Sequence, residues 1–267
     1  KLEDLKKHKC TIEEKEEYEG HIKEGVVVYA GVDYERILHM AEKEADVILW
    51  DGGNNDYPCF KPNLLITVVD PMRPGHELKY FPGEVNVRMA DVIVVNKVNT
   101  AKPENVEKVI RNVRKVNSKA IIIKASSEVY VDNPSLIKGR KVLVIEDGPT
   151  LLHGDLTFGA GYVAAMKYGA AEIVSPRSCA VGSIKKVVEE RGCMAVPALG
   201  YSPEQLRELE DTIRNATCDA VVMATPTDLT RFIKINKPVV KVTFELKEIG
   251  KPDLEDILSD CLEQVKR

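Results

Sequence analysis

The chain alternates between short continuous apolar runs and longer stretches in which apolar residues recur at helical spacing. Continuous apolar runs bounded by polar or turn residues are typical of strands buried on both faces. They predict strands over residues 26–29, 47–50, 64–69, 92–96, 120–124, 142–146, 171–175, 194–199, 219–224 and 239–245.

Amphipathic stretches between these runs predict the helices. They are expected over residues 11–18, 33–43, 103–116, 159–168, 182–191, 203–215, 228–234 and 252–265. Strands alternating with helices indicate an α/β fold with a doubly wound, mostly parallel sheet covered on both faces. We place a boundary near residue 150, so that residues 151–267 form either a C-terminal α/β domain or an extension of the first sheet.

Composition excludes several classes of partner. The net charge of −4 gives no attraction for nucleic acid or an anionic membrane. Apolar runs such as 142–145 are far shorter than the roughly 18 residues of a membrane span. The six cysteines form no C-x-x-C pair, which favours reduced thiols in a cytoplasmic protein over disulfides or zinc ligands. Because the chain begins at Lys1 without a signal segment, we expect a trimmed start.

Polar segments follow four consecutive predicted strands, at residues 51–56, 70–77, 96–99 and 125–127. The carboxyl ends of parallel strands meet at one edge of a sheet, where ligands of such folds bind. The sequence therefore predicts a ligand site at this edge.

The first two segments carry groups that suit phosphate and magnesium. Asp51 would hold Mg²⁺ or its water, and Gly52 and Gly53 would let the backbone approach a phosphate. Arg73 offers a planar fork for a phosphate. His76 fits either a phosphate contact or a turn histidine bonded to the backbone. Alone, an aspartate at a strand end is more often a turn residue and an arginine more often a solvated charge. Their order on consecutive strands favours a site.

The third and fourth segments suit a nucleotide base. Asn96 and Lys97 resemble the Asn-Lys-x-Asp base-recognition motif of guanine-nucleotide proteins, but Asn99 stands at the fourth position. An amide supplies one acceptor oxygen and adds donors, so adenine is favoured over guanine. Ala125 and Ser126 are expected in the loop that closes over the base. The chain contains no Gly-x-x-x-x-Gly-Lys-Ser/Thr loop to hold the phosphates.

A second anion site is an open alternative near residues 146–150 and His153, just before the glycine-rich helix start at 159–161. Free N–H groups at a helix start bind anions. The competing interpretation, held nearly equal, is that the glycines only allow close packing. Arg177 and residues 182–183 would add a phosphate contact, although a solvated arginine is the favoured interpretation there.

Several motifs resemble the cyclic 2,3-diphosphoglycerate synthetase family of P-loop proteins. They occupy residues 30–34, 50–56, 70–77, 82–84, 88–91, 96–98 and 144–150. The resemblance covers most of the chain and implies a P-loop NTPase-like fold. Residues 1–150 would then be the nucleotide-binding region and 151–267 the substrate region, with the P-loop expected upstream of Lys1.

The resemblance implies an ATP-dependent ligase of archaeal type, associated with Mg²⁺ and K⁺. It would phosphorylate 2,3-diphosphoglycerate, close an intramolecular phosphoanhydride and release ADP. The residues assigned to catalysis or to this anionic substrate are Asp51, Asn54, Asn55, Asp70, Arg73, His76, Arg88, His153 and Arg177.

Two other functions stay open on the sequence alone. One is a GTPase of uncharacterised role, and the other is a nucleotide-binding regulatory protein that does not hydrolyse its ligand. For each of these functions we expect a small phosphorylated ligand and a homodimer.

Overall fold

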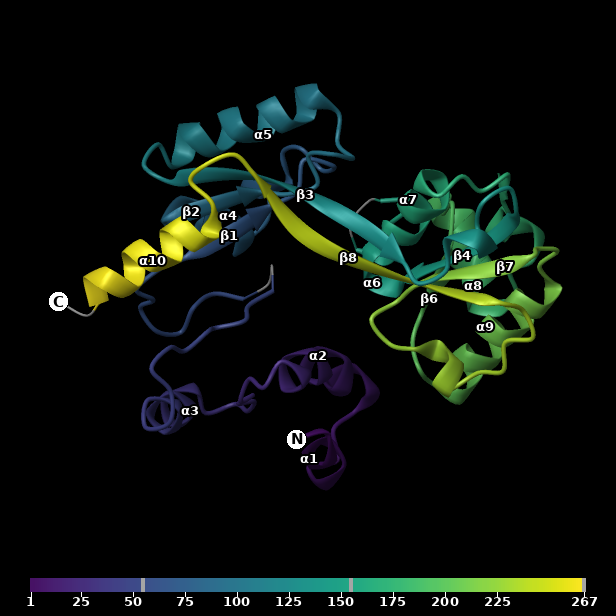
Figure 1. The fold of residues 1–267 in the computed structure, drawn as a ribbon, viewed down its shortest axis with the longest axis horizontal. Helices are drawn as coiled ribbons and strands as arrows, with labels where there is room; N and C mark the ends of the chain where they lie inside the picture. The colour runs from purple at the N-terminus through teal and green to yellow at the C-terminus, as the bar shows by residue number, and fades with distance from the viewer. Residues whose placement is uncertain (54–55, 154–155, 266–267) are drawn as a thin grey trace. The chain divides into compact units, whose positions relative to one another are not determined.

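The computed structural model describes residues 1–53, 56–153 and 156–265. The chain divides into two compact units, Lys1–Pro62 and Asn63–Arg267, which are described separately (Figure 1).

The first unit contains the helices α1 (Leu2–Lys7), α2 (Ile12–Lys23) and α3 (Tyr34–Ala41). The Thr11 hydroxyl accepts the Glu14 N–H, and the Glu14 carboxylate accepts the Thr11 N–H. This capping box satisfies backbone donors that the first turn leaves unpaired, and it confirms the predicted start of α2. The Asp33 carboxylate accepts the Arg36 N–H at 3.1 Å and starts α3.

The strands predicted at 26–29 and 47–50 are wrong. Both segments lie outside every sheet of the described residues, and Leu49 is 80% exposed. An apolar run forms a strand only where a neighbouring strand takes its backbone hydrogen bonds, and the sequence shows the run but not the partner. The second segment ends instead on Trp50, whose ring packs edge-to-face on Tyr34 and Phe60 with centroids 5.1 and 5.0 Å away.

The second unit is built on one eight-stranded sheet in the order β1-β2-β3-β8-β7-β4-β5, with β6 paired to β4. Its strands are β1 (Ile66–Val69), β2 (Val92–Val95), β3 (Ile121–Val131), β4 (Lys141–Asp147), β5 (Glu172–Ile173), β6 (Val196–Ala198), β7 (Ala220–Ala224) and β8 (Val239–Ile249). Every ladder between these strands is parallel except β3–β8. The mostly parallel α/β fold is confirmed, and the second half of the chain extends the sheet of the first.

The antiparallel ladder of β3 and β8 joins two groups of parallel strands (Figure 1). It runs from Lys124 opposite Ile249 to Val131 opposite Val242, so β3 continues well past its predicted end at residue 124. The boundary predicted near residue 150 lies inside this unit, just after β4. The assignment of residues 1–150 and 151–267 to different functions stays a prediction.

The second unit has seven helices among its described residues. They are α4 (Gly83–Met89), α5 (Pro103–Val116), α6 (Gly148–Leu152), α7 (Ala160–Lys167), α8 (Gly182–Arg191), α9 (Pro203–Asn215) and α10 (Leu254–Val265), with short 3₁₀ turns at His76–Leu78, Pro134–Leu136, Pro176–Ser178 and Leu229–Arg231. All of these helices except α4 and α6 lie where the amphipathic patterns predict one. The ranges of α5, α8 and α9 equal the predicted ones, whereas the helix predicted at 228–234 is only a 3₁₀ turn. Val106, Val109 and Val113 of α5 are buried against β2.

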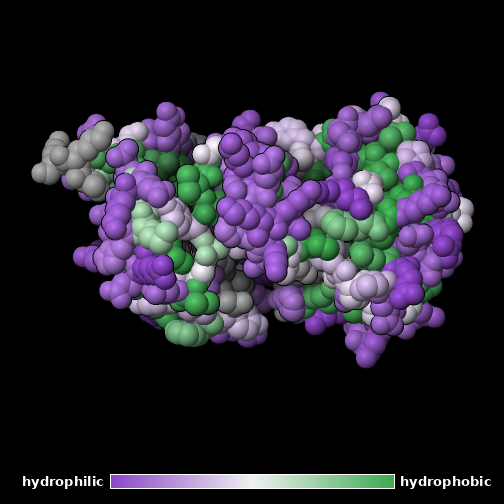
Figure 2. Space-filling view, turned by 90° about the horizontal axis from the view of Figure 1, so that it is seen from below, coloured by the Kyte–Doolittle hydropathy of each residue, from purple (hydrophilic) through white to green (hydrophobic). Residues whose placement is uncertain are grey.

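The surface mixes hydrophilic and apolar residues on the face shown in Figure 2. Among the described residues, none of the helices has the length and apolar character that crossing a membrane requires.

Candidate functional site

Asp70 joins the loops that follow β1 and β2. Its carboxylate accepts hydrogen bonds from Lys97 Nζ at 2.8 Å and Arg73 Nη2 at 3.0 Å, and from the Met72 N–H at 2.9 Å. Only 16% of the Asp70 side chain is exposed. Three predicted site residues, Asp70, Arg73 and Lys97, are therefore brought together at the carboxyl edge of the sheet. We call them the Asp70 cluster.

The Asp70 cluster has more positive than negative charge. Burial by itself raises the pKa of Asp70, but Lys97, the Met72 N–H and Arg73 outweigh it and hold that pKa below its ordinary value of 3.8. The carboxylate is therefore ionised at neutral pH between two partly exposed cations. A guanidinium fork and an ammonium group held side by side suit an anionic ligand such as a phosphate.

The loop after β2 is braced by its two asparagines. Asn96 Oδ1 accepts the Lys97 N–H at 2.7 Å, and Lys97 has a φ of 57°, which is uncommon for a residue other than glycine. The Asn99 amide exchanges two hydrogen bonds of 3.2 Å with the backbone of Ser127. This exchange fastens the loop to β3. A contact of Asn99 with a base stays a prediction.

Ala125 and Ser126 are not in a loop, contrary to the prediction. Both lie inside β3, opposite Glu248 and Lys247 of β8, and both are buried. The Ser126 hydroxyl donates to the Lys247 carbonyl at 3.3 Å. The strand continues here because β8 supplies a partner that no local pattern reveals. Their part in closing over a base stays a prediction.

A buried carboxylate that the sequence analysis missed supports the loop of Arg73. Glu77 Oε2 accepts the Gly75 N–H at 2.7 Å, and Glu77 Oε1 accepts Asn112 Nδ2 of α5 at 2.7 Å. No local signal links two residues this far apart. His76, in the same turn, packs its ring edge-to-face on Tyr80 at 5.1 Å.

Asp51, Gly52 and Gly53 belong to the first unit. The Asp51 side chain is 86% exposed and lies 3.7 Å from His21 Nε2, while the Gly53 N–H donates to the Asp56 carboxylate at 2.7 Å. The predicted residues 54 and 55, both asparagines, lie outside the described residues.

The prediction that Asp51 binds Mg²⁺ can be compared with the side chains around it. In the part of the chain that the structure describes, no group of three or more His, Cys, Asp or Glu side chains converges as metal ligands. Mg²⁺ is commonly held by one or two carboxylates together with substrate phosphates. A role of Asp51 as one ligand of a nucleotide-bound Mg²⁺ stays a prediction.

Two other predicted basic residues, Arg88 and Arg177, lie away from the Asp70 cluster, and no contact of His153 with the cluster is seen among the described residues. Arg88, in the last turn of α4, pairs with Glu84 of the first turn. Helix α4 leads into the start of β2, whereas Asn96 follows the end of that strand. Arg177 is exposed after β5, at the other edge of the sheet from β1. His153 is exposed at the end of α6.

The protein's own carboxylates fill the helix starts considered as anion sites. Glu146, at the end of β4, is 2% exposed, and its Oε1 accepts the N–H groups of Gly159 at 3.0 Å and Tyr162 at 2.8 Å. A Cβ on Gly159 would lie 2.7 Å from Glu146 Oε2. At α8, Glu208 accepts the N–H of Ser183 at 3.0 Å and also its hydroxyl. The structure thus supports the packing interpretation of these glycines.

Burial raises the pKa of Glu146 to about 7, although the N–H groups of Tyr162, Gly161 and Gly159 act in the opposite direction. A carboxyl group with this pKa changes its charge near neutral pH.

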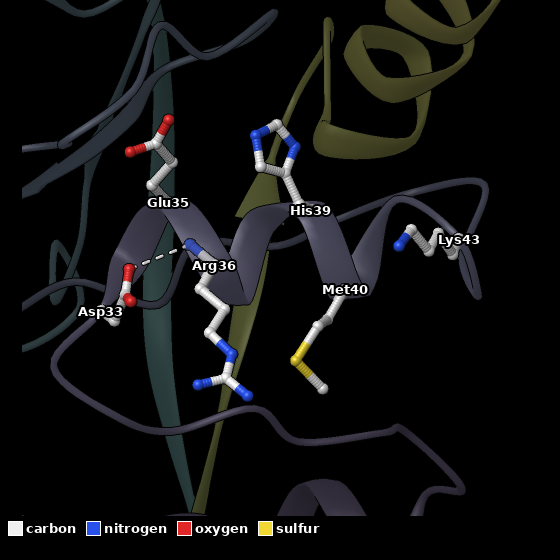
Figure 3. A pocket seen from close by; sticks show the side chains of 6 residues that line it. All are labelled: Asp33, Glu35, Arg36, His39, Met40 and Lys43. Atoms are coloured by element: carbon white, nitrogen blue, oxygen red, sulfur yellow. Dashed lines mark hydrogen bonds between the residues drawn. The ribbon is translucent and has the colours of Figure 1, made fainter.

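A hollow along α3 in the first unit is lined by side chains of the helix and its ends (Figure 3). Glu35 and His39 point to one side of α3, whereas Arg36 and Met40 point to the other (Figure 3). These groups do not converge on a common ligand, and we assign no function to them.

Comparison with known proteins agrees with the fold. Residues 23–126 match the family model described as "Cyclic 2,3-diphosphoglycerate synthetase, P-loop domain", so this part has a P-loop NTPase-like fold. Over these residues, the match and the motifs identified in the sequence point to the same family.

Two relatives in the genus Thermococcus differ in name and in similarity. The arginine synthetase ArcE of Thermococcus kodakarensis is 58% identical over 261 residues, which is 97% of this chain and 58% of that protein. The cyclic 2,3-diphosphoglycerate synthetase of Thermococcus sibiricus is 27% identical over 114 residues, which is 42% of this chain and 26% of that protein. This chain thus spans little more than half the length of the first relative.

Among solved structures, LpxK from Aquifex aeolicus in complex with ATP aligns with a TM-score of 0.32 and 13% identity, covering 77% of this chain and 53% of that one. A TM-score this low does not establish a shared fold.

Proposed function

We propose that the protein is an ATP-dependent ligase whose product is arginine. The observation that carries this proposal is the 58% identity to an arginine synthetase across 97% of the chain. The name of that relative describes a whole protein, of which this chain covers 58%. The phosphate-binding loop expected upstream of Lys1 stays a prediction.

The geometry at the sheet edge supports a nucleotide-dependent reaction. Arg73 and Lys97 present two cations that share the Asp70 carboxylate, and fixed cations stabilise the charge that develops on transferred phosphates. Asp51, which belongs to the first unit, stays a predicted ligand of Mg²⁺ on its own, and that ion would neutralise phosphate charge when bound. No finding supports the predicted K⁺.

The reverse reaction tests this proposal without assuming the second reactant. Full-length protein is incubated with L-arginine, ADP and phosphate, and separately with L-arginine, AMP and pyrophosphate, and ATP is measured with luciferase. We expect ATP in one of the two mixtures and none when arginine is omitted. Absence of arginine-dependent ATP from both would remove the assignment.

A second candidate is the cyclising ligase that acts on 2,3-diphosphoglycerate. It is favoured by the family model over residues 23–126 and by the name of the second relative. Incubation with ATP and 2,3-diphosphoglycerate, followed by phosphorus NMR, would show the cyclic product. GTP in place of ATP tests the GTPase alternative, and absence of turnover with all of these reactants would favour the regulatory one.

A further inference from the structure

A cavity of about 140 Å³ lies beside the Asp70 cluster in the second unit. Its walls come from the loops after β1 and β2, from β3 and β8, from Thr150 of α6, and from residues 156–163 at the start of α7. Segments far apart in the sequence therefore meet around one small space. The functions considered above use Lys97 but assign no ligand to this space.

The body of the cavity is apolar. Val129 of β3, Phe158 before α7 and Val163 within α7 line it together with Met72. An engineered cavity of about 150 Å³ with apolar walls binds benzene. This cavity therefore has room for one six-membered ring or an alkyl group of similar size.

Three hydroxyl groups also line the cavity, those of Thr100, Ser127 and Thr150. All three residues are half-buried, and within the described residues none of these hydroxyls has a hydrogen-bond partner. A few convergent polar groups in an apolar cavity are typical of small-molecule sites. The ligand is therefore expected to carry a polar group.

The charge of Lys97 indicates that the polar group of the ligand is an anion. Lys97 is the one charged side chain among the described residues that line the cavity. Its ammonium group has three donors, and one of them meets Asp70. The start of α7 attracts no ligand, because the N–H groups of Gly159 and Tyr162 already bind Glu146.

We propose that this cavity binds a small organic carboxylate, with its ring or alkyl body between Val129 and Phe158 and its carboxylate at Lys97. The proposal does not rest on the ligase assignment, since binding requires neither ATP nor turnover.

Three ligands that share one ring and differ in charge test it: benzoate, benzyl alcohol and benzylamine. Their affinities for the full-length protein are measured by titration, with protein NMR as the readout. We expect benzoate to bind about ten-fold more tightly than benzyl alcohol, because a hydrogen bond to a charged group is stronger than a neutral one. Benzylamine should bind most weakly. In Lys97→Met the affinities of benzoate and benzyl alcohol should become equal.

Variants that fill the cavity locate the binding. Ala160→Leu from the start of α7 and Thr150→Leu from α6 should each abolish benzoate binding, whereas Ala171→Leu, at an exposed position outside the lining, should retain it. Circular dichroism checks that each variant folds, and either filling variant suffices if the other does not fold. Benzoate that does not bind the native protein at millimolar concentration, binds no better than benzyl alcohol, or binds a folded filling variant unchanged would overturn the proposal.

Discussion

Replacing Glu146 by glutamine should remove the loss of stability that this carboxyl group causes as the pH rises from 5 to 8. The pKa of Glu146 is raised from 4.5 to about 7 in the folded protein. The folded state therefore holds this proton more tightly than the unfolded state does. The resulting stabilisation is complete below pH 4.5 and is lost as the pH rises through 7. At about 1.4 kcal/mol per unit it amounts to about 3 kcal/mol, and most of this falls between pH 5 and pH 8.

Glutamine keeps an acceptor oxygen for the N–H groups of Gly159 and Tyr162 but has no proton to lose. The free energy of unfolding of Glu146→Gln should therefore rise relative to the native protein by about 2–3 kcal/mol between pH 5 and pH 8. Urea unfolding of both proteins, followed by circular dichroism at pH 5, 6, 7 and 8 and one ionic strength, measures this difference. Other titrating groups contribute equally to both proteins and cancel.

Asp70→Asn is the matched control, because its shift has the opposite sign. The pKa of Asp70 is lowered in the folded state, so its stabilisation is present above the unfolded value of 3.8 and is lost as the pH falls through the folded value. Its difference from the native protein should stay constant from pH 5 to pH 8. An equally constant difference for Glu146→Gln would refute the reasoning.

The remaining predictions concern the stability of the fold and the binding of ATP. Gly161→Ala should lower the free energy of unfolding in urea by about 1–3 kcal/mol, because its Cβ would lie under 3 Å from side chains of β4 and β7. Gly20→Ala is the matched control within α2, where no atom lies within 4 Å of the added Cβ. It should raise the free energy of unfolding by up to about 1 kcal/mol. Asn112→Ala should lower the free energy of unfolding by about 1–3 kcal/mol, because the Oε1 atom of the buried Glu77 loses its donor, and an unchanged urea midpoint would contradict this. Arg73→Gln should weaken binding of ATP to the full-length protein about ten-fold in calorimetry, and unchanged affinity would remove Arg73 from the phosphate site.

Much of the second unit could be predicted because its elements carry their own signals. Helix α5 combines Pro103 at its start with a regular apolar stripe, and its predicted range is the observed one. Strand β2 is apolar throughout and buried throughout. The segments at 26–29 and 47–50 carry the same apolar signal, but a strand also needs a partner, and that depends on residues elsewhere.

Part of the candidate site could also be predicted from the sequence. Asp70, Arg73 and Lys97 meet because each follows a parallel strand, and strand order brings their loops to one edge. The braces could not be predicted, since Glu77 meets Asn112, and Glu146 meets Gly159 and Tyr162, across loops whose course the sequence does not show. The cavity, likewise, is formed by segments that only the folded sheet brings together.

The ladder between β3 and β8 also orders events during synthesis. Ser126 and its partner Lys247 are 121 positions apart, and such distant pairings form slowly compared with local ones. The strands β1 to β3 and the strands β4 to β7 can each assemble while the chain is still being made, but they share no ladder until β8 emerges at Val239–Ile249. Until then β3 and β7 each have a bare edge, which is the kind of surface that pairs with other chains. A nascent chain that stalls shortly before residue 239 is thus the form of this protein most exposed to aggregation.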